Sequence, residues 1–185
     1  PRTLSGELRT SPNPGALRSA LRYVVSLGLL ARNGFLLHAA GLVESGRGYA
    51  LFGPSGAGKS TAASLSEGRA SVLGDELCAL VRSPSGWEVH GTPFHGSLES
   101  SGRQMGAPLA AAALLEQSER AEAAPLGRRE ALLHLYPQVF RPSRSPEITG
   151  RWLFLLDALV RERHCLRLRF RRDPEFWACL KERAA

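Results

Sequence analysis

The chain has 185 residues, of which 43% are hydrophobic, and a formal net charge of +7 at neutral pH. This length suits one domain with a sizeable core, and no run of about 18 apolar residues occurs that could cross a bilayer. We expect a cytosolic protein without membrane contact, with residues 1–13 as a flexible arm and residues 14–185 as a single domain. The three cysteines, Cys78, Cys165 and Cys179, have no metal-like spacing, and their odd number argues against a disulfide framework.

The basic excess is concentrated in the C-terminal third. Residues 128–185 carry 13 basic and 7 acidic side chains, whereas residues 1–127 carry 11 and 10. An arginine-rich surface can bind polyanions or an acidic partner. Aromatic residues are not interleaved with these arginines, so we expect an ordinary solvated face and no binding of nucleic acid.

A helix and a hairpin are predicted first along the chain. A helix over 14–31 follows from apolar residues at helical spacing, namely Leu17, Leu21, Val24, Val25 and Leu29. Residues 35–43 then read as a buried strand, residues 44–47 as a tight turn and residues 48–52 as a second strand. A two-residue turn centred on Ser45-Gly46 places His38 opposite Gly53 across this hairpin.

The remaining elements follow a glycine-rich segment at 53–60. We predict a helix over 59–68, a strand over 71–73 that ends at Gly74-Asp75-Glu76, and a strand over 77–81 that returns as a hairpin through 87–91. Residues 92–106 are rich in Gly and Ser and read as an irregular, mobile substrate loop. Helices are then predicted at 108–123, 126–137 and 147–163, a strand at 165–170, and a helix at 173–183 with Asp173 as N-cap and Pro174 as its first residue.

Residues 53–60 read GPSGAGKS and fit the phosphate-loop pattern G-x-x-x-x-G-K-S/T at every fixed position. Glycines let backbone N–H groups turn toward a polyphosphate, the lysine reaches the β- and γ-phosphates, and the serine hydroxyl ligates Mg²⁺. We therefore predict a site for ATP and Mg²⁺, although no motif that reads adenine is visible. The residues predicted to bind the nucleotide are Gly53, Ser55, Gly56, Ala57, Gly58, Lys59, Ser60 and Thr61.

Two carboxylates and a histidine complete the predicted chemistry. Asp75 and Glu76 follow a strand that should end beside the 53–60 segment, where one can hold Mg²⁺ together with Ser60 while the other activates a hydroxyl. Adjacent carboxylates raise the pKa of one of them, as a general base requires. Asp75 leads as the base with His38 in support, but the sequence leaves open which carboxylate is base and which is metal ligand.

Five further residues are weaker candidates for contact with the acceptor. Thr92 and His95 lie where an acceptor could approach, with simple turn chemistry as the alternative. Arg103, on the predicted loop, could clamp the transferring phosphoryl group, with a solvated surface position as the alternative. Arg141 and Arg144 flank Pro142 and could do the same or bind the acceptor, with solvated surface positions as the alternative.

These motifs together resemble a known family. A strand with an embedded histidine, a hairpin, GPSGAGKS and then VLGDEL resemble the HPr kinase/phosphorylase group, whose core is related to phosphoenolpyruvate carboxykinase. The order LLHAAG, GYALFGPSGAGKST, LGDEL and VHGTPF, with the ending LRLRFRRDPEFW, is closer still to small HPr-kinase-like proteins of bacterial peptide-modification clusters, including lasso-peptide clusters. The resemblance spans about 20–180. The second signature of authentic HPr kinases has no counterpart here, so HPr as acceptor and the reverse, phosphorylase reaction are both left open.

The resemblance implies an α/β P-loop fold with a phosphoenolpyruvate carboxykinase-like mixed sheet and flanking helices. It also implies that His38, Asp75 and Glu76 serve the phosphorylated or attacking hydroxyl, with Mg²⁺ nearby. We expect an ATP-dependent kinase that transfers the γ-phosphate to a serine of a peptide or small protein. The alternatives are a kinase for a small-molecule hydroxyl such as free serine, or a non-catalytic nucleotide-binding regulatory protein. The oligomeric state is left open, with a homo-oligomer as one option.

Overall fold

The computed structural model describes residues 7, 9, 13–94, 96 and 104–184. The arm predicted for residues 1–13 falls almost entirely outside these residues. His95, Arg103 and much of the predicted 92–106 loop also lie outside the described residues.

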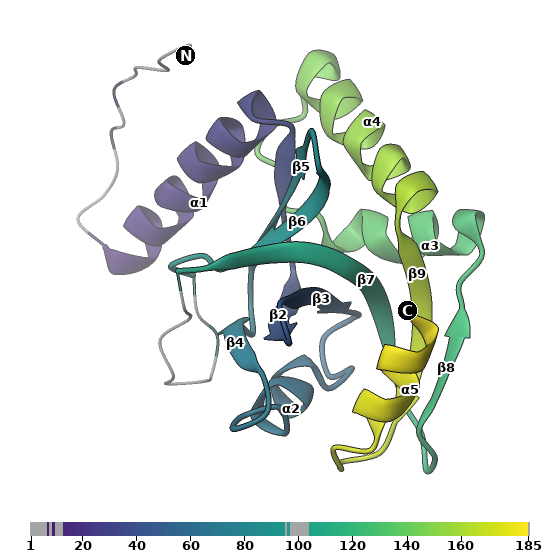
Figure 1. Ribbon diagram of the computed structural model, residues 1–185. Coiled ribbons are helices and arrows are strands. Elements are labelled where there is room, and N and C mark those ends of the chain that lie inside the picture. The colour runs from purple at the N-terminus through teal and green to yellow at the C-terminus, as the bar shows by residue number, and fades with distance from the viewer. Residues whose placement is uncertain (1–6, 8, 10–12, 95, 97–103, 185) are drawn as a thin grey trace.

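The described residues form a mixed α/β fold, which confirms the predicted α/β class with a mixed sheet and flanking helices. The helices are α1 (Pro14–Ala31), α2 (Lys59–Ser64), α3 (Arg128–Leu135), the 3-10 turn η1 (Tyr136–Gln138), α4 (Pro146–Glu162) and α5 (Phe176–Arg183). The strands are β1 (Gly34–Leu37), β2 (Ala39–Glu44), β3 (Arg47–Phe52), β4 (Ser71–Gly74), β5 (Cys78–Ser83), β6 (Gly86–His90), β7 (Gly106–Gln117), β8 (Glu122–Pro125) and β9 (His164–Phe170). Within the described chain they join in one mixed sheet in the order β1-β5-β6-β7-β3-β2-β4, and β9 and β8 extend it from β7. Figure 1 shows a strongly curled sheet with helices on both sides.

The hairpin β2–β3 has the predicted register. Ala39 pairs with Phe52 and Glu44 with Arg47, and the two turn residues have positive φ values, 51° at Ser45 and 74° at Gly46. Positive φ at both central residues is the requirement of a type I′ hairpin turn. The predicted strand over 35–43 is nevertheless interrupted at His38, because β1 pairs with β5 while β2 pairs with β3.

The helix predicted at 108–123 is wrong, because this segment contains the long strand β7 and the short strand β8. The alanines of β7 favour a helix by about 1 kcal/mol or less per residue. As a strand, β7 instead hydrogen-bonds to β6, β3 and β9 and buries side chains on both faces of the sheet. Ala112 and Leu114 face one core, and Ala111, Ala113 and Leu115 face the other. Tertiary pairing and burial on two faces therefore override the local helix preference.

Smaller differences concern the ends and faces of helices. Helix α2 ends at Ser64, and α5 begins at Phe176 because the Asp173 side chain accepts a hydrogen bond from the Glu175 amide at 3.0 Å rather than capping the helix. In α1, Leu17, Leu21 and Val24 are exposed. The inward face carries Arg22, Ser26 and Leu29 instead.

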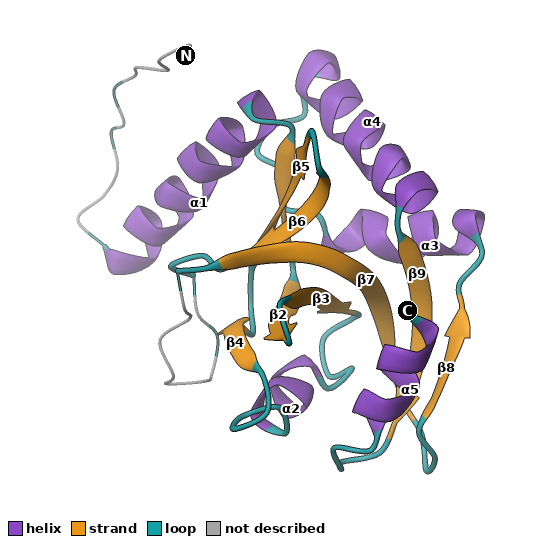
Figure 2. Cartoon of the chain, viewed as in Figure 1, coloured by secondary structure: helices purple, strands orange, loops and turns teal. Residues whose placement is uncertain are grey.

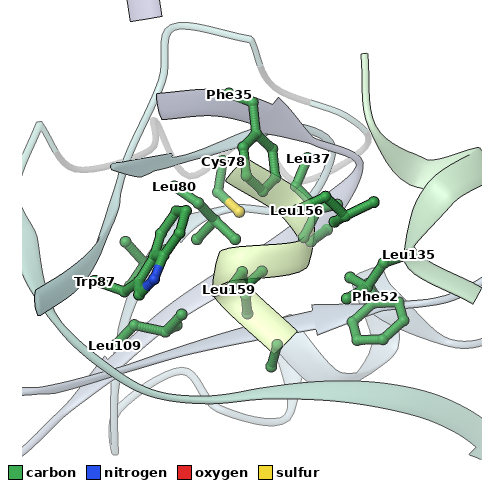
Figure 3. Packing of buried hydrophobic residues seen from close by; sticks show 14 of the residues in the cluster. Phe35, Leu37, Phe52, Cys78, Leu80, Trp87, Leu109, Leu135, Leu156 and Leu159 are labelled. Atoms are coloured by element: carbon green, nitrogen blue, oxygen red, sulfur yellow. The ribbon is translucent and has the colours of Figure 1, made fainter. Parts of the chain in front are cut away.

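Two hydrophobic cores lie on opposite faces of the sheet. Helices α3 and α4 cover one face, where Leu156 and Leu159 pack against Phe35, Leu80 and Trp87 (Figure 3). Helices α2 and α5 cover the other face (Figure 2), and the Trp177 indole of α5 donates a hydrogen bond to the Ser66 hydroxyl at 3.0 Å. A smaller cluster under α1 includes Leu36, Leu77, Ala79 and Phe94. The sheet is thereby held in place on both sides.

The described helices include none that is long and apolar enough to span a bilayer. Two of the three cysteines belong to the interior, where burial raises the pKa of the Cys78 thiol to about 12 and that of Cys165 to about 11. Cys179 is partly exposed. At neutral pH the two buried thiols are therefore protonated and act as small apolar side chains.

Replacement of Gly48 by alanine tests the close contact between β3 and β6. A Cβ atom at this position would lie 2.3 Å from Val89 Cγ1 and about 3.1 Å from the carbonyl oxygen of Pro108. We expect Gly48→Ala to lower the free energy of unfolding by about 1–3 kcal/mol, measured by urea denaturation. Gly150→Ala is the matched control, because a Cβ there meets nothing within 4 Å and lies in α4, so it should stabilise the helix by about 0.5–1 kcal/mol. Equal stability of Gly48→Ala and wild type would contradict the packing described.

Candidate functional site

Three parallel strands end at the same edge of the sheet and bring the candidate site together. Strands β3 and β9 both run parallel to β7 and lie on its two sides. Strand β3 leads into the 53–60 segment, β7 leads through Gln117 into Ser118, and β9 leads through Phe170 into Arg171 and Arg172. All three segments line one cavity of about 620 Å³. Ligands of open α/β sheets bind outside the carboxyl ends of such strands.

The 53–60 segment is a turn that needs glycine. Gly56 and Gly58 have φ values of 80° and 103°, which residues with a Cβ rarely adopt. At Gly58 a Cβ atom would also lie 2.8 Å from the Phe170 ring. The Gln117 amide donates a hydrogen bond to the Gly56 carbonyl at 2.7 Å and ties the turn to the end of β7.

Lys59 is buried at the start of α2, with only 7% of its surface exposed. Its ammonium group donates hydrogen bonds to the carbonyls of Gly53 at 2.8 Å and Pro54 at 3.0 Å. Burial lowers the pKa of Lys59. The cation is therefore held over its own turn and faces the cavity, where an anion would restore the favourable environment that burial removes.

The acidic pair lies beside this turn, as the sequence predicted, but its two members turn to different partners. Asp75 follows β4 and is 4% exposed. One of its carboxylate oxygens accepts a hydrogen bond from the Ser60 hydroxyl at 2.9 Å, and the other accepts one from the Gly96 amide at 2.9 Å. This carboxylate connects α2 with the segment beyond β6.

Glu76 forms an ion pair with Arg22 of α1, at 2.7 Å between Nη2 and Oε1. The Arg22 guanidinium also lies over the Phe94 ring, 5.5 Å from its centroid. Sequence reasoning missed Arg22, because the face of α1 that packs on the sheet could not be identified from spacing alone. Arg22 stands one turn before Ser26, which is buried, so its place on the inward face follows from the packing of α1 and not from a sequence signal.

His38 occupies the bend between β1 and β2, and its backbone N–H donates to the Gln138 carbonyl at 2.8 Å. Its pKa lies below the usual value of 6.5, first because burial disfavours the charged form and then because of the positive charge of Lys59. The Arg22 guanidinium acts in the same direction, whereas the Glu76 carboxylate opposes it. His38 is therefore a neutral imidazole at pH 7.

The large cavity contains most of the predicted site residues. Its lining includes His38, Ser55, Gly56, Gly58, Lys59, Ser60, Thr61, Asp75 and Glu76. Gly53 and Ala57 of the predicted nucleotide-binding set belong to the same turn but are buried beneath it. The cavity lining that sequence reasoning did not single out comprises Gly96, Gln117, Ser118, Phe170, Arg171 and Arg172.

The arginines at the end of β9 give the cavity a positive rim. Arg171 pairs with Asp173 and, at 3.3 Å, with Glu175. Arg172 is exposed and makes no ion pair within the described part of the chain. In the same C-terminal third, Arg128, Arg161, Arg167 and Arg169 pair with acidic side chains, whereas the exposed Arg172 lines the cavity.

The weaker candidates that the structure describes, Thr92, Arg141 and Arg144, do not line the cavity. Thr92 is buried, and its hydroxyl donates to the Leu77 carbonyl at 2.6 Å and accepts from the Phe94 amide, which is the turn chemistry considered as its alternative. Arg141 lies over the Tyr136 ring at 5.3 Å, and Arg144 is exposed on the surface. His95 and Arg103 fall outside the described residues.

The donor set beside the 53–60 turn fits Mg²⁺. Among the described residues, no group of three or more His, Cys, Asp or Glu side chains is arranged to hold a metal ion. Mg²⁺ in nucleotide sites needs fewer ligands, since one or two protein oxygens act together with phosphates and waters. The Ser60 hydroxyl and the Asp75 carboxylate, 2.9 Å apart, are oxygen ligands of this kind.

Fold and cavity together define a mixed α/β protein with a polar cavity around a glycine-rich turn. The family model described as SynChlorMet cassette protein ScmC matches residues 17–139, and the chain therefore belongs to the ScmC family. No curated protein matches the chain. The matched residues include most of α1, the 53–60 turn, the acidic pair and η1.

This match corrects the family resemblance proposed from the motifs. The assignment to the HPr kinase/phosphorylase group, and to its relatives in peptide-modification clusters, is wrong, because the family model that matches is that of ScmC. The motifs that suggested it are short and determine the local geometry of a turn and a hairpin. Such local geometry recurs on unrelated chains and does not identify a family.

The pKa of His38 can be measured by NMR titration of its imidazole. We expect a value below 6.5, a still lower value in Glu76→Gln, and a higher one in Arg22→Gln, according to the signs of the neighbouring charges. The pKa of His38 is lower in the folded chain than in the unfolded chain. At a pH between these two values the unfolded chain binds more protons, so His38 destabilises the fold as the pH drops below 6.5. A His38 pKa at or above that of an unstructured peptide would contradict the burial described.

Proposed function

We propose that this protein binds ATP with Mg²⁺ and transfers the γ-phosphoryl group to a hydroxyl. The observation that carries the proposal is the convergence of Lys59, the Ser60–Asp75 pair, His38 and Arg172 on one cavity of about 620 Å³. A protein that only binds and releases a nucleotide requires the turn and a metal ligand. A neutral histidine beside them adds a group that can handle the proton of an acceptor.

The 53–60 turn is the phosphate loop of this proposal. Lys59 would exchange its two carbonyl contacts for phosphate oxygens, and Arg172 would face the terminal phosphate from the end of β9. We also propose that the chain is a P-loop domain with a phosphoenolpyruvate carboxykinase-like sheet. Its support is the strand β3 that leads into the turn and the helix α2 that follows. A cytosolic location, where ATP is abundant, is also part of it.

Mg²⁺ would be held by Ser60 and Asp75. When bound, it would neutralise charge on the β- and γ-phosphates and orient them. This arrangement assigns Asp75 to the metal side of the site, because both its oxygens already contact Ser60 and the Gly96 amide. This role for Asp75 as a metal ligand differs from the expectation from the sequence, in which Asp75 leads as the base.

His38 is the proton acceptor in this proposal. The acceptor hydroxyl oxygen forms a bond to the γ-phosphorus, the bond to the β–γ bridging oxygen breaks with its electron pair leaving on ADP, and the hydroxyl proton passes to the neutral imidazole. A weak base suffices, since phosphoryl transfer proceeds through a loose transition state with little bond formation to the nucleophile. We propose a serine of a peptide or small protein as the acceptor, and free serine is the small-molecule rival.

Substitution of Lys59 tests the phosphate loop. We expect Lys59→Ala to weaken binding of a fluorescent ATP analogue by about 10- to 100-fold, the value of a hydrogen bond to a charged group. Lys181→Ala is the matched control, because Lys181 is the chain's other lysine and pairs with Glu44 at 2.8 Å, away from the cavity. Unchanged binding in Lys59→Ala would remove the 53–60 turn as the nucleotide site.

Substitution of Asp75 tests phosphoryl transfer. Wild type is incubated with γ-labelled ATP, Mg²⁺, serine peptides and free serine, and label in an acceptor is measured. We expect Asp75→Asn to reduce transfer by at least about 100-fold, because removal of one electrostatic stabiliser costs this much, and the Mg²⁺ dependence of ATP binding should be lost with it. Asp157→Asn is the control, since Asp157 pairs with Arg128 and Arg161 at the surface. Tight ATP binding by wild type with no label in any acceptor would instead favour a nucleotide-binding regulatory protein.

A further inference from the structure

A second, smaller cavity of about 240 Å³ adjoins the large one, and His38 and Glu76 line both. Its other walls are Arg22 of α1, Leu77, and residues 137–140 around the end of η1. A ligand in this cavity would thus meet the same two side chains that face the proposed nucleotide. None of the functional assignments above uses this space.

The walls of the second cavity are built into the fold. The Gln138 carbonyl accepts from the His38 amide at 2.8 Å, and the Phe140 amide donates to the Leu36 carbonyl at 2.9 Å. Between them Val139 forms a β-bridge with Leu37. Residues 138–140 therefore act as a short extra strand along the chain that leads through His38, and the cavity does not depend on a loose surface loop.

The lining combines polar and apolar side chains. Arg22, His38, Glu76 and Gln138 are its polar members, and the Arg22 side chain is fixed by its ion pair and by the Phe94 ring. Leu77, which is 5% exposed, and Val139, which is 4% exposed, are apolar members together with Pro137 and Phe140. A matching ligand carries both polar and apolar groups.

The volume limits the size of that ligand. A cavity of about 240 Å³ corresponds to roughly eight water molecules at about 30 Å³ each, and it is smaller than the roughly 300–1,000 Å³ typical of whole-ligand sites. One or two small amino-acid residues fit this space, whereas a second nucleotide does not. The net charge of the lining is close to zero, because Arg22 and Glu76 neutralise each other, so a strongly charged acceptor is not favoured.

We propose that the second cavity is the acceptor subsite and that it takes a serine residue of a peptide together with an apolar neighbouring side chain. This inference rests on the proposed phosphoryl transfer. The hydroxyl lies at the shared wall of His38 and Glu76, where its oxygen bonds to the γ-phosphorus as ADP leaves and its proton passes to His38. The apolar neighbour packs against Leu77, Val139 and Phe140.

The test uses two probes, N-acetyl-Leu-Ser-Leu-amide as an acceptor and N-acetyl-Leu-Ala-Leu-amide as a ligand that cannot accept phosphate. We expect Phe140→Ala to raise the KM for the serine peptide by about ten-fold or more. The Kd for the alanine peptide, measured by calorimetry, should rise by a similar factor, while the Kd for ATP stays within about two-fold, a difference of about 0.4 kcal/mol. Phe140→Leu, which keeps most of the packing, should show a smaller change in the same direction. Tyr136→Ala is the matched control, since Tyr136 precedes the cavity segment and packs on Trp152 outside it. N-acetyl-Gly-Ser-Gly-amide should be a poorer acceptor than the leucine peptide.

The outcomes separate this subsite from the transfer reaction itself. Label transfer with equal KM in wild type, Phe140→Ala and Phe140→Leu would overturn the subsite and leave the kinase proposal standing. Binding of the alanine peptide that Phe140→Ala weakens, without label transfer to the serine peptide, would support the subsite as a peptide site and overturn the kinase proposal. No binding of either peptide, or a preference for free serine, would overturn the peptide subsite.

Discussion

The pairing of β7 with strands on both sides is the constraint on which the rest of the structure depends. Its side chains are mostly alanine and leucine, so helices can pack closely on both faces of the sheet at this strand. Because β3 and β9 run parallel to it, their carboxyl ends meet at one edge. That edge carries the 53–60 turn and Arg172, which lie far apart in the sequence and belong to one cavity.

A second constraint is the opposite orientation of two neighbouring carboxylates. Asp75 bonds to Ser60 at 2.9 Å, and Glu76 pairs with Arg22 at 2.7 Å. The first contact belongs to the large cavity and the second to its boundary with the small one. His38, kept neutral by burial and by nearby cations, lies at the same boundary. The large cavity thus contains the Lys59 cation and the Ser60–Asp75 pair, and the small one combines polar and apolar side chains.

The failures of sequence reasoning have different physical causes. The 108–123 segment was predicted as a helix because alanine and leucine favour helices locally, whereas pairing with three strands, which no local pattern reports, decided the outcome. The family assignment failed because it rested on short motifs, and the ScmC match over residues 17–139 overturned it. Sequence reasoning did not identify Arg22, because its position depends on how α1 packs on the sheet. It did not identify Arg172, because its position depends on the direction of β9.

The sequence by itself determined the features that depend on neighbouring residues. These are the glycine turn at 53–60, the β2–β3 hairpin whose type I′ turn places His38 at the level of Gly53, and the acidic pair that follows β4. Turn geometry and hairpin register are local, because a few backbone angles and a period of two residues set them. Only the tertiary structure decided that β7 is a strand, that Glu76 faces Arg22, and that residues 137–140 enclose a second cavity beside His38. Each of these features depends on contacts between segments that are distant in sequence. A local sequence pattern does not report the free energy of such contacts.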